Sequence, residues 1–75
     1  MKRGRLKQRF GRIVRRRREA AGMSQETLAE AAGLHRTYIS LLERGLREPQ
    51  LGTIAALAGG LGTSMSSLLG ELERS

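Results

Sequence analysis

The chain has 75 residues, no Cys, no Asp, a single His and a formal net charge of +7. A chain of this length forms one small domain of marginal stability, which a partner subunit would help to stabilise, and it leaves no room for a ligand-sensing domain. The missing Cys and Asp exclude disulfides and leave almost nothing for a metal site or a catalytic centre, so we expect no metal, no cofactor, no small-molecule ligand and no enzyme activity.

The first eighteen residues hold most of the positive charge. They contain ten of the fourteen basic residues and no acidic one, whereas residues 19–75 contain four basic and seven acidic residues, so the two parts carry +10 and −3. This asymmetry favours a polyanionic partner, namely DNA, RNA or an anionic membrane, over a basic tail that only aids solubility. A membrane is the weakest of these, because Phe10 and Tyr38 are the only aromatic residues. No apolar run is long enough to span a bilayer or resembles a signal peptide, so we expect a soluble cytoplasmic protein.

Residues 1–8 are predicted to form a basic flexible arm, because apolar residues do not recur there with a helical period. The remaining residues, 9–75, are predicted to form one domain. Its first helix carries Phe10, Ile13 and Val14 on one side, and Gly22 closes it in a left-handed conformation.

Four more short helices follow. Ser24 is a good N-cap for the second helix, which Gly33 ends, and a third helix is predicted over 36–44, stopped by Gly45 and Pro49. The fourth and fifth helices have apolar sides formed by Leu51, Ile54, Leu57, Ala58 and Leu61, and by Met65, Leu68, Leu69 and Leu72. Strand-like alternation is absent from the sequence, which predicts an all-α domain of five short helices.

The third helix is strongly amphipathic. At about 100° per residue, one arc holds hydrogen-bonding and cationic side chains with one aliphatic among them, namely Arg36, Thr37, Ser40, Leu41 and Arg44. The opposite arc is apolar and suits the core. Arginine can donate two hydrogen bonds to guanine, Ser and Thr can bond to several bases, and an aliphatic group can contact a thymine methyl, so the polar arc suits the major groove. An ordinary solvated face would favour Glu and Lys pairs instead.

The segment SQETLAEAAGLHRTYISLLERG, followed by REPQLGTIAALAGGLGTSMSSLL, carries a specific motif: SQ, LA, a turn Gly, YIS, ERG, a Pro and a terminal LG. Over about residues 10–72 the chain resembles the lambda-repressor-like helix-turn-helix family, also called the Xre or Cro/C1 type. It is most similar to restriction-modification controller proteins and to small phage or plasmid regulators. The resemblance implies a compact five-helix DNA-binding domain with its helix-turn-helix at about 24–44. It also implies a transcriptional regulator that binds double-stranded operator DNA as a homodimer.

The resemblance further implies a role for each matching residue. The base-reading positions hold Arg36, Thr37, Ser40 and Leu41. The matching positions that contact the DNA backbone hold Gln25, Tyr38, Arg44 and Arg47, and we also expect backbone contacts from His35, Arg15 and Arg17, although His35 and Arg17 depart from the family pattern. The basic side chains expected to reach the minor groove or phosphates are Lys2, Arg3, Arg5, Lys7 and Arg9. Arg18 and Glu43 match an internal ion pair that ties the first helix to the third.

Three of these positions keep a second interpretation. Packing alone explains Tyr38 about as well as a phosphate contact does. His35 is a weaker N-cap than the Ser, Asp or Thr that is usual there. Arg17 occupies a position where relatives often have Leu, so its aliphatic stem can cover the core.

The dimer contact is predicted on the fifth helix and the end of the fourth, where the spare apolar residues are Leu61, Met65, Leu68 and Leu72. Burial of the same residues in the monomer core is an equally good interpretation. The alternative function is an antitoxin-type protein-interaction module of the same fold, whose main task is to bind and neutralise a toxin.

Overall fold

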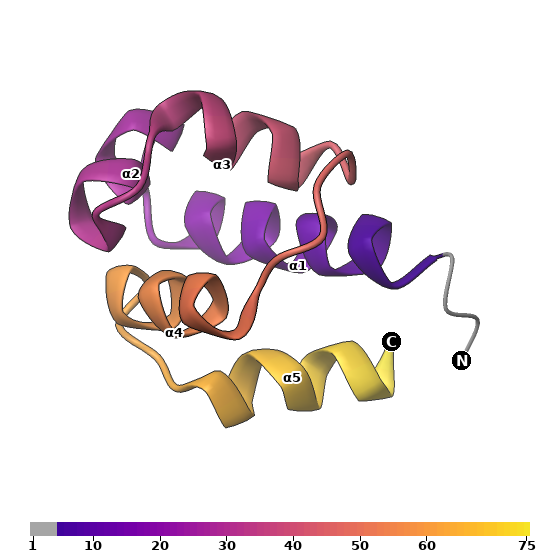
Figure 1. Ribbon diagram of the computed structural model, residues 1–75. Helices are drawn as coiled ribbons and strands as arrows, with labels where there is room; N and C mark the ends of the chain where they lie inside the picture. Colours follow the sequence, from indigo (N-terminus) through magenta and orange to yellow (C-terminus); the bar gives the residue numbers. More distant parts are fainter. Residues whose placement is uncertain (1–4) are drawn as a thin grey trace.

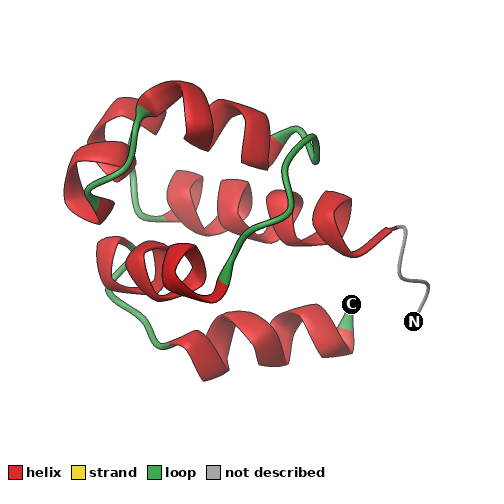
Figure 2. Ribbon diagram, viewed as in Figure 1, coloured by secondary structure: helices red, strands yellow, loops and turns green. Residues whose placement is uncertain are grey.

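The structure is a computed structural model, and it describes residues 5–75. In that range five helices follow one another without a strand: α1 (Leu6–Ala20), α2 (Gln25–Ala32), α3 (Arg36–Glu43), α4 (Leu51–Gly60) and α5 (Met65–Arg74) (Figures 1 and 2). In Figure 1, α2 and α3 lie above α1, and α4 and α5 lie below it. The predicted all-α fold of five short helices is confirmed.

Helix α1 begins earlier than predicted. The arm was expected over residues 1–8, but Arg5 is the N-cap and the helix starts at Leu6. The reason is tertiary, because Leu6 lies one helical turn before Phe10 and both line the same apolar groove. Lys7 and Arg9 are therefore helical residues and not part of a flexible arm. Lys2 and Arg3 lie outside the described residues.

The core draws apolar side chains from all five helices: Phe10, Ile13, Val14, Leu28, Ala29, Ile39, Leu42, Ile54, Leu57, Ala58 and Leu68.

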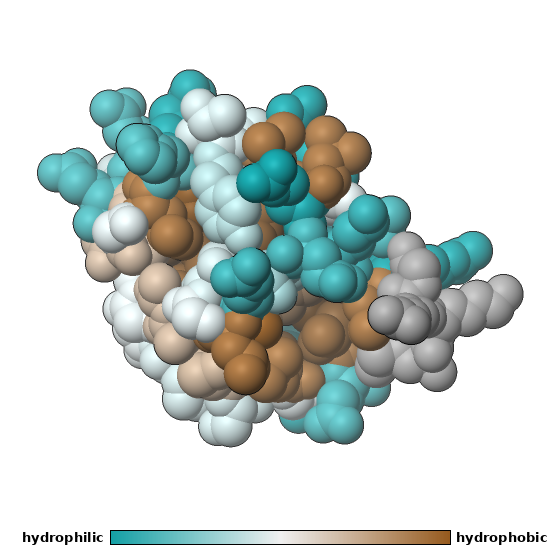
Figure 3. Space-filling model, viewed as in Figure 1, coloured by the Kyte–Doolittle hydropathy of each residue, from teal (hydrophilic) through white to brown (hydrophobic). Residues whose placement is uncertain are grey.

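Leu68 is completely buried, which rules it out as a dimer contact. Its place in the predicted interface was wrong because an apolar helix face looks the same in sequence whether it meets the core or a partner. Leu61, Met65 and Leu72 are half-buried and pack against this core. On the face shown in Figure 3, apolar surface gathers over the start of α4 and towards the end of α5.

Helix α1 approaches α3 closely at Gly11. A Cβ atom there would clash with the backbone carbonyl oxygen of Leu42 and come within 2.9 Å of that of Glu43. Gly60 of α4 makes a similar approach to α2, where a Cβ atom would lie 3.1 Å from Ala32 Cβ. These contacts fix α2 and α3 on the rest of the domain at backbone-to-backbone distance.

Arginines of α1 hold α5 in place. Arg17 Nε donates to Glu71 (2.9 Å) and Arg17 Nη2 to Ser67 Oγ (3.0 Å), and Arg16 Nη2 donates to the other Glu71 oxygen at 2.6 Å. Arg9 Nη2 donates to the Leu72 carbonyl at 2.9 Å and to the Ser75 carbonyl. Arg17 and Arg9 thus brace α1 against α5. Their predicted contacts with DNA stay predictions, although their guanidinium groups already have intramolecular partners.

The described residues contain no single helix that is long and apolar enough to cross a membrane. Helices α4 and α5 reach that length and apolar character only when taken together, and the chain bends by 105° between them.

Candidate nucleic-acid interface

Helices α2 and α3 form a helix-turn-helix. Ser24 caps α2 by accepting a hydrogen bond from the Thr27 backbone N–H at 3.0 Å, as predicted. Gly33 ends α2 with φ of 68°, a left-handed conformation that other residues adopt at a cost. The Leu34 N–H then bonds back to the Ala29 carbonyl at 2.8 Å, which turns the chain into α3 two residues later.

A buried ion pair locks α3 to the two helices that precede it. Arg18 Nε and Nη2 donate to the two carboxylate oxygens of Glu43 at 2.7 and 3.0 Å, and Arg18 Nη1 donates to the Met23 carbonyl at 2.8 Å. Gln25 Nε2 of α2 donates to Glu43 Oε1 at 3.0 Å. The Glu43 side chain is only 2% exposed, and its hydrogen bond raises the pKa of the Arg18 guanidinium above its ordinary value, although burial opposes that shift. The predicted internal ion pair is confirmed, and Gln25 completes it.

The outer face of α3 is polar and accessible. Arg36, Thr37 and Arg44 are exposed, while Ser40 and Leu41 are half-buried beside them. Neither Arg36 nor Arg44 forms an ion pair with any acidic residue in the described range. Arg44 folds back along the helix, with its Nε 3.4 Å from the Ser40 carbonyl oxygen. The cationic groups of this face are therefore available to an external anion.

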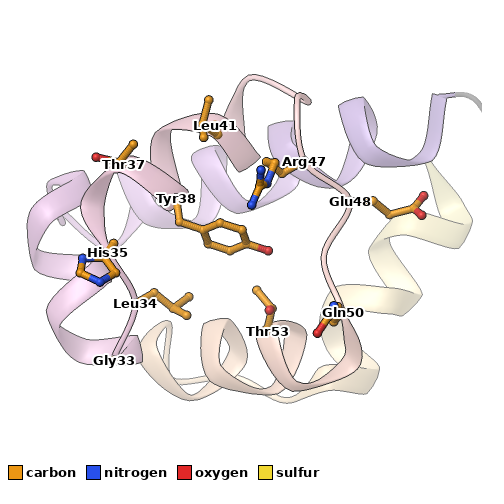
Figure 4. Close-up of a pocket in the computed structure, with 10 residues that line it drawn as sticks. All are labelled: Gly33, Leu34, His35, Thr37, Tyr38, Leu41, Arg47, Glu48, Gln50 and Thr53. Atoms are coloured by element: carbon orange, nitrogen blue, oxygen red, sulfur yellow. The ribbon is translucent and has the colours of Figure 1, made fainter.

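A hollow of about 650 Å³, the recognition cleft, adjoins this face. It lies between α3 and the start of α4, and its lining residues are Gly33, Leu34, His35, Thr37, Tyr38, Leu41, Arg47, Glu48, Gln50 and Thr53 (Figure 4). The Arg47 guanidinium carbon lies 5.8 Å from the centre of the Tyr38 ring, a distance at which cation and ring attract. Tyr38 is half-buried, so its ring packs while its edge faces the cleft.

The structure brings most of the predicted contact residues together. His35, Thr37, Tyr38, Leu41 and Arg47 line the recognition cleft, and the polar face of α3 continues from it. Arg15 does not line the cleft, because it lies on the exposed side of α1 and pairs with Glu19 at 3.3 Å. Its predicted contact with the DNA backbone stays a prediction.

Sequence reasoning missed three polar cleft residues, namely Glu48 in the loop before α4 and Gln50 and Thr53 at the start of α4. Gln50 is the N-cap of α4 and makes no side-chain capping hydrogen bond, so its amide group is not used locally. For Gln50 and Thr53 the available signal was Pro49, which marks the start of a helix one residue before Gln50 and four residues before Thr53.

Comparison with known proteins identifies this arrangement. A profile of the helix-turn-helix family matches residues 14–68 of the chain. The control protein C.SmaI of Serratia marcescens is 45% identical over 64 residues, which cover 85% of this chain and 76% of that protein. The chain belongs to the helix-turn-helix family.

Solved structures of similar proteins share the fold of this helix-turn-helix protein. The restriction-modification controller protein C.AhdI from Aeromonas hydrophila is 43% identical, with a TM-score of 0.79 over 81% of this chain and 92% of that one. The controller protein C.Esp1396I, solved as a tetramer in complex with its natural 35 base-pair operator, is 30% identical, with a TM-score of 0.85 over 92% of this chain and 91% of that one. This helix-turn-helix protein is a DNA-binding transcriptional regulator of the Cro/C1 type.

The entry to α3 lacks a side-chain cap. His35 is the N-cap residue, yet its side chain makes no capping hydrogen bond. The exposed imidazole instead lies at the edge of the recognition cleft (Figure 4).

Proposed function

We propose that this chain is a cytoplasmic, controller-type regulator that binds operator DNA as a homodimer and places α3 in the major groove. The observation that carries the proposal is the exposed, unpaired Arg36 and Thr37 at the first turn of a helix that a buried ion pair holds rigid. A side chain that reads DNA must have its hydrogen-bonding groups available to a base, while the helix that carries it is held in a fixed position. Helix α3 meets both conditions.

The proposed contacts divide into those that specify sequence and those that position the protein. Arg36 and Thr37, with Ser40 and Leu41 behind them, face base edges and supply roughly 1 to 3 kcal/mol of discrimination for each good base contact. Phosphates are contacted by Arg44 and Arg47 from the exit of α3 and by His35 and Tyr38 from the cleft, with Gln50 and Thr53 added from α4.

Two further predicted contacts have a narrower role. Gln25 already donates one amide hydrogen to Glu43, so only its second amide hydrogen remains for a phosphate. Arg5, which is exposed at the start of α1, and the basic residues before it supply the general attraction to DNA.

A homodimer would place two copies of α3 about one DNA turn apart, roughly 34 Å, on a near-palindromic operator. The solved tetramer of C.Esp1396I on its operator supports an oligomer on DNA, although that assembly is stated of the relative alone.

The test compares Arg36→Ala with Arg74→Ala, which removes an exposed arginine at the far end of α5. Fluorescence anisotropy would measure binding to a selected operator and to random DNA at several salt concentrations. Arg36→Ala should lose about 10- to 100-fold of its preference for the operator and keep salt-sensitive binding to random DNA, while Arg74→Ala should keep both. Equal losses on the two DNAs would refute base reading by Arg36. Tight co-purification with a second protein and weak DNA binding would favour the antitoxin alternative.

A further inference from the structure

A second hollow, the arginine hollow, lies on the side of α1 that faces away from the core. Its volume is about 340 Å³, and its lining residues are all charged: Arg12, Arg15, Arg16 and Glu19. The last three lie three, four and seven positions after Arg12, which keeps all of them on one face of the helix. At about 100° per residue, this face lies opposite the buried Phe10, Ile13 and Val14.

The fold leaves much of the positive charge of the arginine hollow unused. Arg12 forms no ion pair with an acidic residue in the described range. Arg15 pairs with Glu19 at 3.3 Å, but both side chains are more than half exposed, so this pair contributes little and opens easily. Arg16 shares the Glu71 carboxylate with a second arginine of α1. The hollow therefore holds more positive charge than the acidic residues around it neutralise.

The composition of this face favours phosphates over other anionic partners. Arginine can donate two parallel hydrogen bonds to a phosphate, and interfaces with nucleic acid are more polar and more positively charged than those between proteins. A protein partner would need an apolar centre to the contact, and a membrane would need apolar side chains to insert. No apolar residue of the described range lines the hollow, and the exposed large apolar residues, Leu46 and Leu51, lie outside α1.

The positive charge continues along α1 beyond the hollow. Arg5, the exposed N-cap residue of α1, lies seven positions before Arg12 and therefore on the same face. From Arg5 to Arg16 the helix rises about 16 Å, which is longer than a single phosphate group. Such a row suits a polymer with closely spaced charges, and duplex DNA carries one charge per about 1.7 Å of its axis. A small phosphorylated ligand would leave Arg5 without a partner.

The arginine hollow and the recognition cleft lie on different sides of the domain. None of the ten residues that line the cleft comes from α1, whereas all residues that line the hollow do (Figure 4). Helix α3 packs on α1 at Gly11 and Arg18, which lie about 100° around α1 from the hollow. An operator held in the cleft would therefore leave the arginine hollow accessible.

We infer that the arginine hollow binds the phosphates of a second DNA duplex while α3 holds the operator, so that the protein bridges two DNA segments. Arg12 and Arg16 donate to phosphate oxygens, and Arg15 joins them when its exposed pair with Glu19 opens. The Glu19 carboxylate repels the phosphates and limits the affinity of the site. This inference rests on the proposed operator binding by α3 and adds a contact that does not depend on sequence.

The test measures how well protein that is already bound to DNA captures a second duplex. The full chain saturates an immobilised operator no longer than its binding site, and a fluorescent duplex of unrelated sequence is then added. Arg12→Gln should weaken capture about 10-fold and lower the slope of log affinity against log salt by about 1, because one phosphate contact is lost. Glu19→Gln should strengthen capture several-fold, since it removes the opposing carboxylate and frees Arg15. The matched control, Arg74→Gln, removes an exposed arginine outside the hollow and should change capture by less than about 2-fold.

The same variants should bind the operator as tightly as the wild-type chain in fluorescence anisotropy, which separates this site from α3. Equal capture by Arg12→Gln and Arg74→Gln would overturn the inference, as would displacement of the second duplex by poly-glutamate as readily as by DNA of equal charge. Weaker binding of Arg12→Gln to a longer operator, without capture of a second duplex, would place the flank of the same duplex on α1 and also overturn it. A wild-type chain with no preference for the operator would refute the proposed function, and capture that still depended on Arg12 would then support the arginine hollow by itself.

Discussion

Removal of the Glu43 carboxylate tests how strongly the recognition helix is anchored. Glu43→Gln keeps the shape of the side chain but leaves the Arg18 guanidinium without a counter-charge, in a site where Arg18 is 9% exposed. Loss of one partner of a buried pair typically costs 3 to 5 kcal/mol. We expect the lower end, about 3 kcal/mol, because Arg18 keeps its hydrogen bond to the Met23 carbonyl and some contact with water. For a small domain this is a large part of its total stability.

The assay is urea unfolding followed by circular dichroism, with two comparison variants. Glu19→Gln breaks the pair between Arg15 and Glu19, whose side chains are 63% and 54% exposed, and should cost less than about 0.5 kcal/mol. The double variant Arg18→Met, Glu43→Leu should recover most of the loss, because apolar side chains of similar size can replace a buried pair. A loss below about 1 kcal/mol for Glu43→Gln would refute the anchoring argument.

Three further predictions follow from the glycines and the basic N-terminus. Gly11→Ala should destabilise the domain by about 1 to 3 kcal/mol in thermal unfolding, because its methyl group meets backbone carbonyls of α3; a stability equal to wild type would contradict the close approach. Gly33→Ala should cost about 1 to 2 kcal/mol at its left-handed φ, whereas Gly59→Ala, in an open position inside α4, should stabilise by about 0.5 to 1 kcal/mol; the same sign for both would count against this distinction. Replacing Lys2 and Arg3 with Gln should lower the slope of log affinity against log salt by up to about 2, and an unchanged slope would remove these residues from the DNA contact.

Local signals in the sequence were sufficient for the helix-turn-helix. Ser24 and Gly33 mark the ends of α2 by capping and by backbone conformation, which are properties of single residues and their neighbours. The amphipathic pattern of α3 likewise separated its core side, with Ile39 and Leu42 completely buried, from the exposed Arg36. These features depend only on the spacing of residues along one helix, so they can be predicted from a single sequence.

Other features depend on contacts between distant residues. Arg17 and Arg9 of α1 find their partners on α5 or at Ser75, fifty or more positions away, and a basic run in sequence gives no sign of which arginines are already bound. The same reason explains the early start of α1, because Leu6 gains its apolar surroundings from Leu69 and Leu72. The cleft residues Gln50 and Thr53 were missed because only the fold brings the start of α4 beside α3.

Selection of bound sites from random double-stranded DNA tests the central claim most directly, because it reports sequence preference, spacing and symmetry in one measurement. We predict an enriched near-palindrome whose half-sites are centred about one helical turn apart, roughly 10 to 10.5 base pairs, and whose outer guanines lose enrichment in Arg36→Ala. A pool that shows no enriched motif, or a motif that Arg36→Ala leaves unchanged, would contradict sequence recognition by α3.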